Sequence, residues 1–135
     1  MLKRCFTLIE LLIVIIIIGI LALIAVPQFF KVTERARATE GVRALGGLRS
    51  AQIRYYAEHY VMTNDIDDLD YAPATPRYFG TLVPVASIYT GGSESLGTIT
   101  RDPNKDNPFF GAYVLTIHGN GSITCSGGTE CPGGF

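Results

Sequence analysis

The hydrophobic and polar positions divide this chain into an apolar N-terminal stretch and a mixed remainder. Leu11 to Val26 contains no polar side chain, whereas Lys31 opens a region with charged residues, Gly and Pro. With Phe29 and Phe30 the apolar stretch reaches about 20 residues, which is enough for a helix to cross a bilayer. The pattern therefore predicts an apolar helix over residues 6–30.

A second helical segment, residues 31–62, is predicted to be amphipathic. Its apolar side chains recur at the helical period and fall on two faces. The first face carries Ala38, Val42, Leu45, Ile53, Tyr56 and Tyr60, and the second carries Leu48 and Tyr55. Two apolar faces suit a helix that supports a domain on one side and meets neighbouring chains on the other.

Residues 63–135 predict a small globular head of loops and antiparallel strands. Pro84 restricts the strand-like run from Thr81 to Tyr89 to a sheet edge, if it is a strand at all, and a surface loop is expected from Gly91 to Gly97. Two more strands joined by a hairpin turn are expected at Ala112–His118, Gly119-Asn120-Gly121 and Ser122–Cys125. The expected fold class is α+β, with a long N-terminal helix and a small C-terminal antiparallel sheet packed on it.

Composition narrows the possible functions. The chain has 135 residues, enough for one small domain and an anchor, and its formal net charge of −1 implies no general affinity for nucleic acid. It contains no haem-attachment motif, no P-loop and no arrangement of a nucleophile beside a base. We therefore do not expect an enzyme.

Three cysteines are present, Cys5, Cys125 and Cys131. The number becomes even if Cys5 is removed with a leader peptide, which leaves Cys125 and Cys131 free to form a disulfide in an oxidising compartment. The alternative is a pair of unbonded thiols in the C-terminal tail.

The N-terminal segment admits two interpretations from its residues alone. In a cleaved secretory signal peptide, Lys3 and Arg4 would form the basic region, but Glu10 interrupts the apolar region and no A-x-A cleavage site follows. A plain transmembrane anchor explains the length but not Glu10. The basic residues on both sides of the stretch leave the orientation undecided.

A third interpretation rests on a family resemblance. The run from Phe6 to Val14, FTLIELLIV, together with Gly19 and the AVPQF ending, resembles the start of type IV pilins and type II secretion pseudopilins. This resemblance implies that residues 1–5 are a leader, that a prepilin peptidase cuts between Cys5 and Phe6, and that the new Phe6 amine is methylated. The family usually has Gly where this chain has Cys5. The resemblance also implies a cytoplasmic N-terminus and an external head.

Glu10 is the residue expected to control assembly. Near the end of a membrane helix its carboxylate can lie among the lipid headgroups, but in a filament core it needs a charged partner. Cleavage before Phe6 would create an α-amine that could pair with Glu10 of the same or a neighbouring subunit. If the leader stays, Lys3 or Arg4 could take that place. The alternative is that Glu10 only marks the edge of an anchor.

Gly19 and Pro27 are predicted to weaken the apolar helix. Proline lacks the amide hydrogen that the carbonyl of Leu23 needs, and glycine adds backbone freedom. We expect a kink at Pro27 in an isolated subunit and a non-helical stretch between Gly19 and Pro27 in a filament.

One acidic segment could bind calcium. Asp102, Asn104 and Asp106 offer oxygen ligands within a segment that resembles the Asp-Pro…Asn-Pro-aromatic segment of major pseudopilins. The alternative, which we favour, is a turn rich in Asp and Asn that is fixed by proline, because the end of an EF-hand is missing. No metal or cofactor is therefore expected.

The expected function is a structural subunit of a type IV pilus or similar filament. Its partners would be identical subunits, the prepilin peptidase and methylase, the pilus assembly machinery and, before assembly, the inner membrane; afterwards it would lie in an extracellular filament on the cell surface. One alternative is the major pseudopilin of a type II secretion system, favoured by the Asp-Pro…Asn-Pro segment, and another is a membrane-tethered ligand-binding module. The candidate disulfide and the Gly-rich tail favour a pilin.

Overall fold

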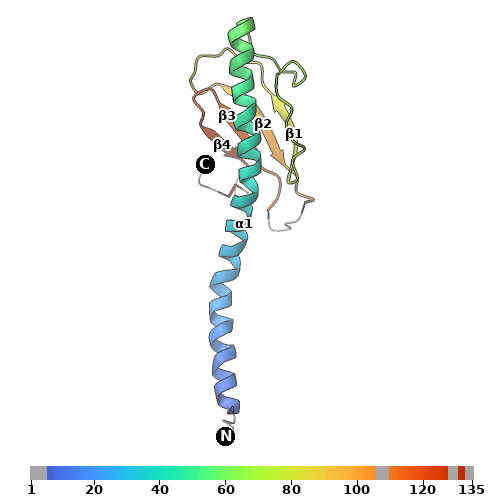
Figure 1. Ribbon diagram of the computed structural model, residues 1–135. Coiled ribbons are helices and arrows are strands. Elements are labelled where there is room, and N and C mark those ends of the chain that lie inside the picture. The colour runs from blue at the N-terminus through green and yellow to red at the C-terminus, as the bar shows by residue number, and fades with distance from the viewer. Residues whose placement is uncertain (1–5, 106–109, 128–130, 133–135) are drawn as a thin grey trace, which may run out of the picture. The chain divides into compact units, whose positions relative to one another are not determined.

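A computed structural model describes residues 6–105, 110–127 and 131–132 of the chain. It contains one long helix and a four-stranded sheet (Figure 1). The elements are α1 (Leu8–His59), β1 (Phe79–Pro84), β2 (Ser95–Arg101), β3 (Val114–His118) and β4 (Ile123–Ser126). The α+β fold expected from the sequence is thereby confirmed. The chain separates into two compact units with a boundary between Thr33 and Glu34, here called unit 1 and unit 2.

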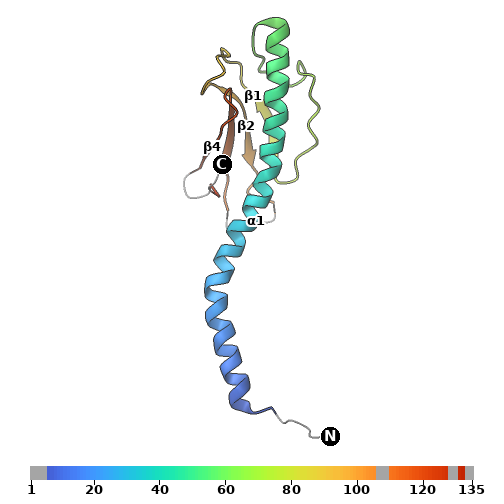
Figure 2. The same ribbon diagram turned by 60° about the vertical axis from the view of Figure 1, so that its left-hand side comes forward.

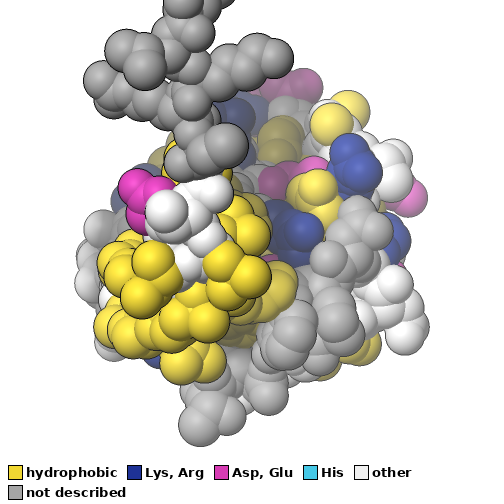
Figure 3. All heavy atoms as spheres, turned by 90° about the horizontal axis from the view of Figure 1, so that it is seen from below, with side chains coloured by type: hydrophobic (Ala, Val, Ile, Leu, Met, Phe, Trp, Pro, Cys, Tyr) yellow, Lys and Arg dark blue, Asp and Glu magenta, His cyan; other side chains and the backbone are white. Residues whose placement is uncertain are grey.

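Unit 1 consists of the apolar part of α1. The most apolar 18 residues have a mean hydropathy of 3.3, and none of their side chains is buried in the structure. Seen end-on, hydrophobic side chains coat the helix (Figure 3). The helix continues through Pro27. Length and composition would allow this helix to cross a membrane.

In unit 2 one face of α1 is buried. Most of the buried residues follow one another at intervals of three or four, which is about one helical turn. They are Glu34, Ala38, Gly41, Leu45, Leu48, Ala51 and Gln52. The prediction of two apolar faces was wrong in detail, because Leu48 lies on the same face as Ala38 and Leu45, and Tyr60 is 79% exposed. The sequence pattern indicated two faces because Glu34, Gly41 and Gln52 interrupt the apolar pattern of the single buried face.

The sheet has the order β1-β2-β3-β4, and all neighbouring strands are antiparallel. Both views of the ribbon place it along one side of α1 within unit 2 (Figures 1 and 2). The core between them comprises Ala38, Leu45, Leu48, Ala51, Met62, Leu69, Phe79, Leu82, Leu96, Ile99, Tyr113, Leu115 and Ile117. The helix and the sheet approach closely at Gly97 of β2, where an added Cβ would lie 2.1 Å from Leu48 Cδ2. A glycine is needed there because any side chain would displace Leu48.

The β3–β4 hairpin agrees with the sequence prediction. The Gly121 N–H donates to the His118 carbonyl over 2.9 Å, and Gly121 has a φ of 87°. This geometry is that of a three-residue hairpin loop whose last residue is left-handed, a position that glycine takes without strain. The strand expected at Thr81–Tyr89 is present only in part: the edge strand β1 begins at Phe79 and ends at Pro84, and residues 85–89 lie outside it.

Strand β2 was not predicted. Its first residues fall within the expected Gly91–Gly97 loop, although β2 is a central strand that buries Leu96 and Ile99. Ser95 and Gly97 have low strand propensity, so the sequence signal was weak. Pairing with β1 on one side and β3 on the other stabilises this strand despite its low strand propensity.

Candidate functional site

The N-terminus of α1 is closed by a reciprocal pair of side chains, Thr7 and Glu10. The Thr7 N–H and hydroxyl donate to Glu10 Oε2 over 3.1 and 2.8 Å, while the Glu10 N–H lies 3.3 Å from Thr7 Oγ1. This is a capping box, in which two amides that lack helical partners are satisfied. The sequence analysis missed it, although Thr-x-x-Glu before an apolar run is its usual signal.

The capping box gives Glu10 a neutral partner in the isolated chain. The carboxylate accepts from the Thr7 N–H and hydroxyl at the start of the helix, where the positive end of the helix dipole also favours it. Thr7 does not neutralise the charge, however. Glu10 therefore retains the capacity to attract a cation from outside this segment.

Around and beyond Glu10, the large apolar side chains of unit 1 are exposed, except the half-buried Phe30. The fractions of the exposed ones range from 45% at Val14 to 82% at Leu8. Gly19 has no atom within 4 Å of an added Cβ, so the helix is open on that side too. A surface this apolar requires lipid or other protein chains around it. Phe6 is 76% exposed, and Cys5 lies outside the described residues.

A fully buried ion pair lies between α1 and the sheet of unit 2. Arg101 Nε donates to Glu34 Oε1 over 2.7 Å, and both side chains have no exposed surface. The Tyr113 hydroxyl donates to the same oxygen over 3.1 Å, and Arg37 Nη1 lies 3.4 Å from Glu34 Oε2. Burial and the adjacent Glu34 carboxylate raise the pKa of Tyr113 far above its ordinary value.

The remaining guanidinium nitrogens of Arg101 hold the backbone around it. Nη1 donates to the carbonyls of Tyr78 and Asp102, and Nη2 donates to that of Lys105 over 2.8 Å. One side chain thus ties β2, the segment before β1 and the segment after β2 to the helix. The sequence analysis singled out neither Glu34 nor Arg101, because charged residues at core positions carry no hydrophobic signal.

The calcium candidates form a turn in the structure. Asp102 Oδ1 accepts from the Asn104 N–H over 3.0 Å, and Asp102 Oδ2 lies 3.9 Å from Lys105 Nζ. Asp106 lies outside the described residues, and the described part of the chain contains no group of three metal-binding side chains. The local hydrogen bond accords with the turn interpretation.

Cys125 and Cys131 form a disulfide with an S–S distance of 2.05 Å. The bond connects β4 to the tail, and Arg35 Nε donates to the Pro132 carbonyl in that tail over 3.0 Å. The disulfide predicted from the cysteine count is therefore confirmed. Together, the bond and the arginine hold Cys131 and Pro132 against the rest of unit 2.

A second hydrogen-bonded cluster lies in the loop before β2 and at the tip of the β3–β4 hairpin. Glu94 accepts from the hydroxyl and N–H of Thr90 and from the N–H groups of Gly91 and Gly92 over 2.8–2.9 Å. Burial alone would raise its pKa, but these donors favour the charged form and lower the pKa to about 2. Arg49 of α1 donates twice to the Gly119 carbonyl at the hairpin tip.

Comparison with known proteins agrees with these features. Residues 3–26 match the family model for the prokaryotic N-terminal methylation motif. The type IV narrow pilus major component PilA5 of Thermus thermophilus is 38% identical over 100 residues, which are 74% of this chain and 72% of that protein.

Two further relatives are longer than this chain. The type IV major pilin protein PilA of Myxococcus xanthus is 38% identical over 85 residues, 63% of this chain and 39% of PilA. A type IV major pilin protein PilE1 of Neisseria gonorrhoeae is 47% identical over 107 residues, 77% of this chain and 50% of that protein. The match thus spans half or less of these two proteins.

An exposed apolar N-terminal helix joined to a small sheet-bearing unit defines a pilin-like subunit. The chain belongs to the type IV pilin family, and its fold is consistent with that family. This is a family of structural subunits rather than enzymes.

Proposed function

We propose that this chain is a major subunit of a type IV pilus, which polymerises with identical copies through its N-terminal helix. The observation that carries the proposal is the uncovered apolar surface of unit 1, which contrasts with the well-packed core of unit 2. Helices of several subunits packed side by side would remove that surface from water.

We further propose that Glu10 selects the incoming subunit. In the isolated chain Thr7 holds its carboxylate. In a filament core, where water is excluded, a cationic partner would stabilise the carboxylate more than a hydroxyl does. The α-amine that forms on cleavage before Phe6 is the cation closest in the sequence, and methylation leaves it charged.

Before assembly, the apolar helix would anchor the subunit in the inner membrane, with the N-terminus in the cytoplasm and unit 2 outside. An oxidising environment around unit 2 agrees with the Cys125–Cys131 disulfide. A prepilin peptidase would remove residues 1–5 and methylate Phe6, and an assembly machine would then extract the subunit into the filament. The names of the matched relatives favour a pilus over the pseudopilus of a secretion system.

Filaments sheared from the surface of producing cells test this proposal. Intact-mass measurement of their main component should give a chain that begins at Phe6 and carries one added methyl group. A mass that includes residues 1–5 would refute the processing step. Filaments composed mainly of another protein would refute the proposed function.

A further inference from the structure

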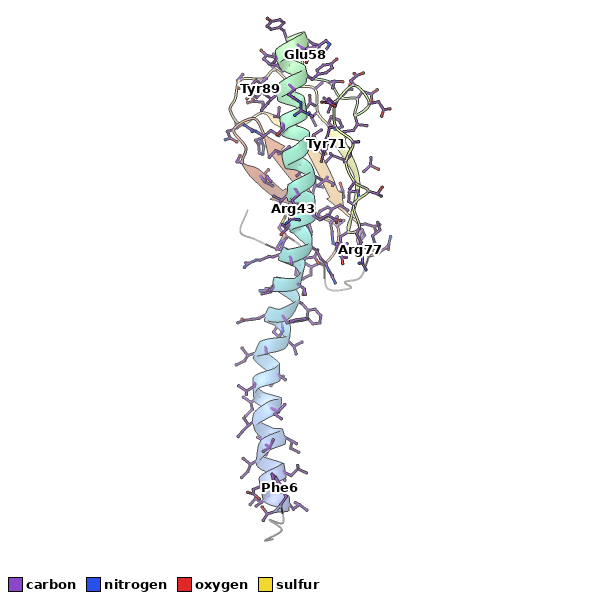
Figure 4. The ribbon with its side chains drawn as sticks, in the orientation of Figure 1. Phe6, Arg43, Glu58, Tyr71, Arg77 and Tyr89 are labelled. Carbon is purple, nitrogen blue, oxygen red and sulfur yellow. A yellow bond between two sulfur atoms is a disulfide. The ribbon has the colours of Figure 1, made fainter. Side chains whose placement is uncertain are left out.

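Charged side chains are sorted by sign along α1 and the segment that follows it. Between residues 31 and 49 the chain carries five basic and two acidic residues, whereas between residues 50 and 70 it carries one basic and five acidic residues. Figure 4 places Glu58 at one end of unit 2 and Arg77 at the opposite end. Unit 2 therefore has an acidic end and a basic end, and the basic end is the one next to the apolar stretch along the chain.

The two carboxylates among residues 31–49 offset only part of the positive charge there. Glu34 is fully buried and pairs with Arg101 in the core, and Arg37 lies 3.4 Å from its second oxygen. Glu40 lines the same hollow as Arg43, so these two charges offset one another. Neither carboxylate forms an ion pair with the basic residues nearest to the apolar stretch.

Those nearest basic residues are Lys31 and Arg35, here called the basic pair. They lie four residues apart on α1, hence on the same side of the helix, and both are exposed. Among the described residues, no carboxylate lies within ion-pair distance of either one. Arg35 Nε donates to the Pro132 carbonyl over 3.0 Å, but a carbonyl does not neutralise the guanidinium. The basic pair thus carries two uncompensated positive charges.

The basic pair begins where the apolar stretch ends, directly after Phe30. If that stretch occupies the hydrocarbon core of a bilayer, the headgroup layer beyond it is about 5–8 Å deep. At 1.5 Å per residue this layer surrounds roughly the next four or five residues of the helix. Lys31 and Arg35 both fall within it.

Membrane insertion by itself does not explain the basic pair. Lys and Arg beside a membrane helix favour the cytoplasmic side, whereas the proposed orientation places residues 31–35 outside. Lys3 and Arg4, which lie on the cytoplasmic side in this orientation, would leave with the leader. The side chains that remain charged next to the membrane on the outer side therefore need a partner of their own.

We propose that Lys31 and Arg35 bind the phosphate groups of anionic phospholipids in the outer leaflet of the inner membrane. This inference rests on the membrane-anchored stage of the proposed function. Anionic headgroups are preferred because zwitterionic headgroups offset the phosphate with a cation of their own. The acidic end of unit 2 would be repelled by the same lipids, so the charge distribution keeps that end away from the membrane. Polymerisation then has to detach the basic pair from the lipid.

A fluorescent reporter beside the basic pair tests this contact. The chain contains no Trp, so Phe29→Trp supplies a single indole two residues before Lys31. The full chain with this change is reconstituted in vesicles of phosphatidylcholine and phosphatidylglycerol, in which one of the two lipids is brominated in its acyl chains. Brominated lipid beside the indole quenches its fluorescence, so exchanging the brominated component gives the relative affinity of the two lipids at this place.

The reporter chain should favour phosphatidylglycerol about fivefold or more at low salt. The preference should fall towards one at a salt concentration of about 1 M, where charges are screened beyond roughly 3 Å. A preference that salt does not change would show that the charges are not involved and would overturn the contact.

Variants in the reporter chain locate the contact. Lys31→Gln/Arg35→Gln should lower the preference to near one. Arg43→Gln/Arg54→Gln removes the same charge about 20 and 36 Å beyond Phe30 along the helix and should keep the preference. Arg35→Lys keeps the charge but gives up the guanidinium that holds the Pro132 carbonyl. It should also keep the preference, which separates the charge from any change in the tail.

The outcomes distinguish this contact from the proposed function. No preference in the reporter chain, or equal losses in the two double variants, would overturn the lipid contact while the filament function stands. An unchanged preference in Lys31→Gln/Arg35→Gln with a lower filament yield would assign the basic pair to a second copy and would also overturn it. If the chain inserts in neither kind of vesicle, or cells that produce it form no filament, the proposed function itself fails.

Discussion

At the residue scale, the buried charges of Glu34 and Arg101 carry the largest desolvation cost in unit 2. A charge removed from water costs several kcal/mol, and attraction offsets this only when the remaining donors and acceptors are satisfied. Here Tyr113 and Arg37 satisfy the carboxylate, and three backbone carbonyls satisfy the guanidinium. The pair therefore fixes the arrangement of unit 2 more than it adds to its stability.

This view leads to a prediction for Arg101→Met. The variant would leave Glu34 buried without its main partner and should lose about 3–5 kcal/mol of the free energy of unfolding. Glu34→Leu/Arg101→Met removes both charges and should recover most of that loss. Urea unfolding of the detergent-solubilised full chain, followed by far-UV circular dichroism, measures both. Equal losses in the two variants would contradict the account.

Glu94 makes the stability of unit 2 depend on acid pH. Its pKa falls from the ordinary 4.5 to about 2 in the folded chain, so its hydrogen bonds contribute fully above about pH 5 and are lost as the pH falls towards 2. Glu94→Gln should lower the melting temperature at pH 6. The difference from wild type should shrink steadily between pH 5 and pH 2. A difference that does not change with pH would mean that the carboxylate charge is not involved.

At the element scale, α1 performs two tasks with one continuous secondary structure. In unit 2 its sheet-facing side is held by a packed core, whereas in unit 1 only its own hydrogen bonds hold it, among the described residues. Helices in proteins are stabilised mainly by packing, so the two halves respond differently to a new environment. Pro27 lies in the half without protein packing.

The predicted helix break between Gly19 and Pro27 remains a prediction. The isolated chain is helical across Pro27, even though the proline removes a hydrogen bond at a cost of about 3 kcal/mol in a helix interior. In a filament, neighbouring helices could favour an extended stretch if they shield the freed backbone groups. A reconstruction of the filament at side-chain resolution should show non-helical backbone within residues 19–27. Unbroken helix from Leu11 to Val32 would refute it.

The strands differ in how readily the sequence predicts them. The β3–β4 hairpin depends on local turn chemistry at Gly121 and was predicted. Strand β2 depends on partners distant in the sequence, β1 and β3, and was missed. Its Gly97, which weakens the local strand signal, is required by the close approach of Leu48.

At the scale of the whole molecule, the two units require different surroundings. Unit 2 buries its own core, whereas unit 1 offers its apolar surface to a membrane or to other chains. A subunit that is stored in lipid and then polymerised needs both. Glu10 lies at the start of the apolar helix, and in the assembly that we propose its carboxylate would move from the membrane edge into the filament core.

Glu10→Leu should therefore separate insertion from assembly. The more apolar helix should still insert in the membrane, while filament yield should fall at least about tenfold because the buried amine loses its partner. Thr7→Val is the matched control: it removes only the hydroxyl of the capping box and should reduce the yield less. The measurements are the amounts of chain in membranes and in sheared filaments. Normal yield from Glu10→Leu would exclude the pairing.

The sequence by itself determined the apolar helix, the α+β class, the β3–β4 hairpin and the family, and it favoured the disulfide, because each depends on local patterns or on residue counts. Only the tertiary structure decided that Glu34 and Arg101 meet in the core, that β2 is a central strand, and that Tyr60 remains exposed. These features arise from contacts between segments distant in the chain. No local pattern encodes them, because burial changes the energetic meaning of a charge, a glycine or an aromatic ring.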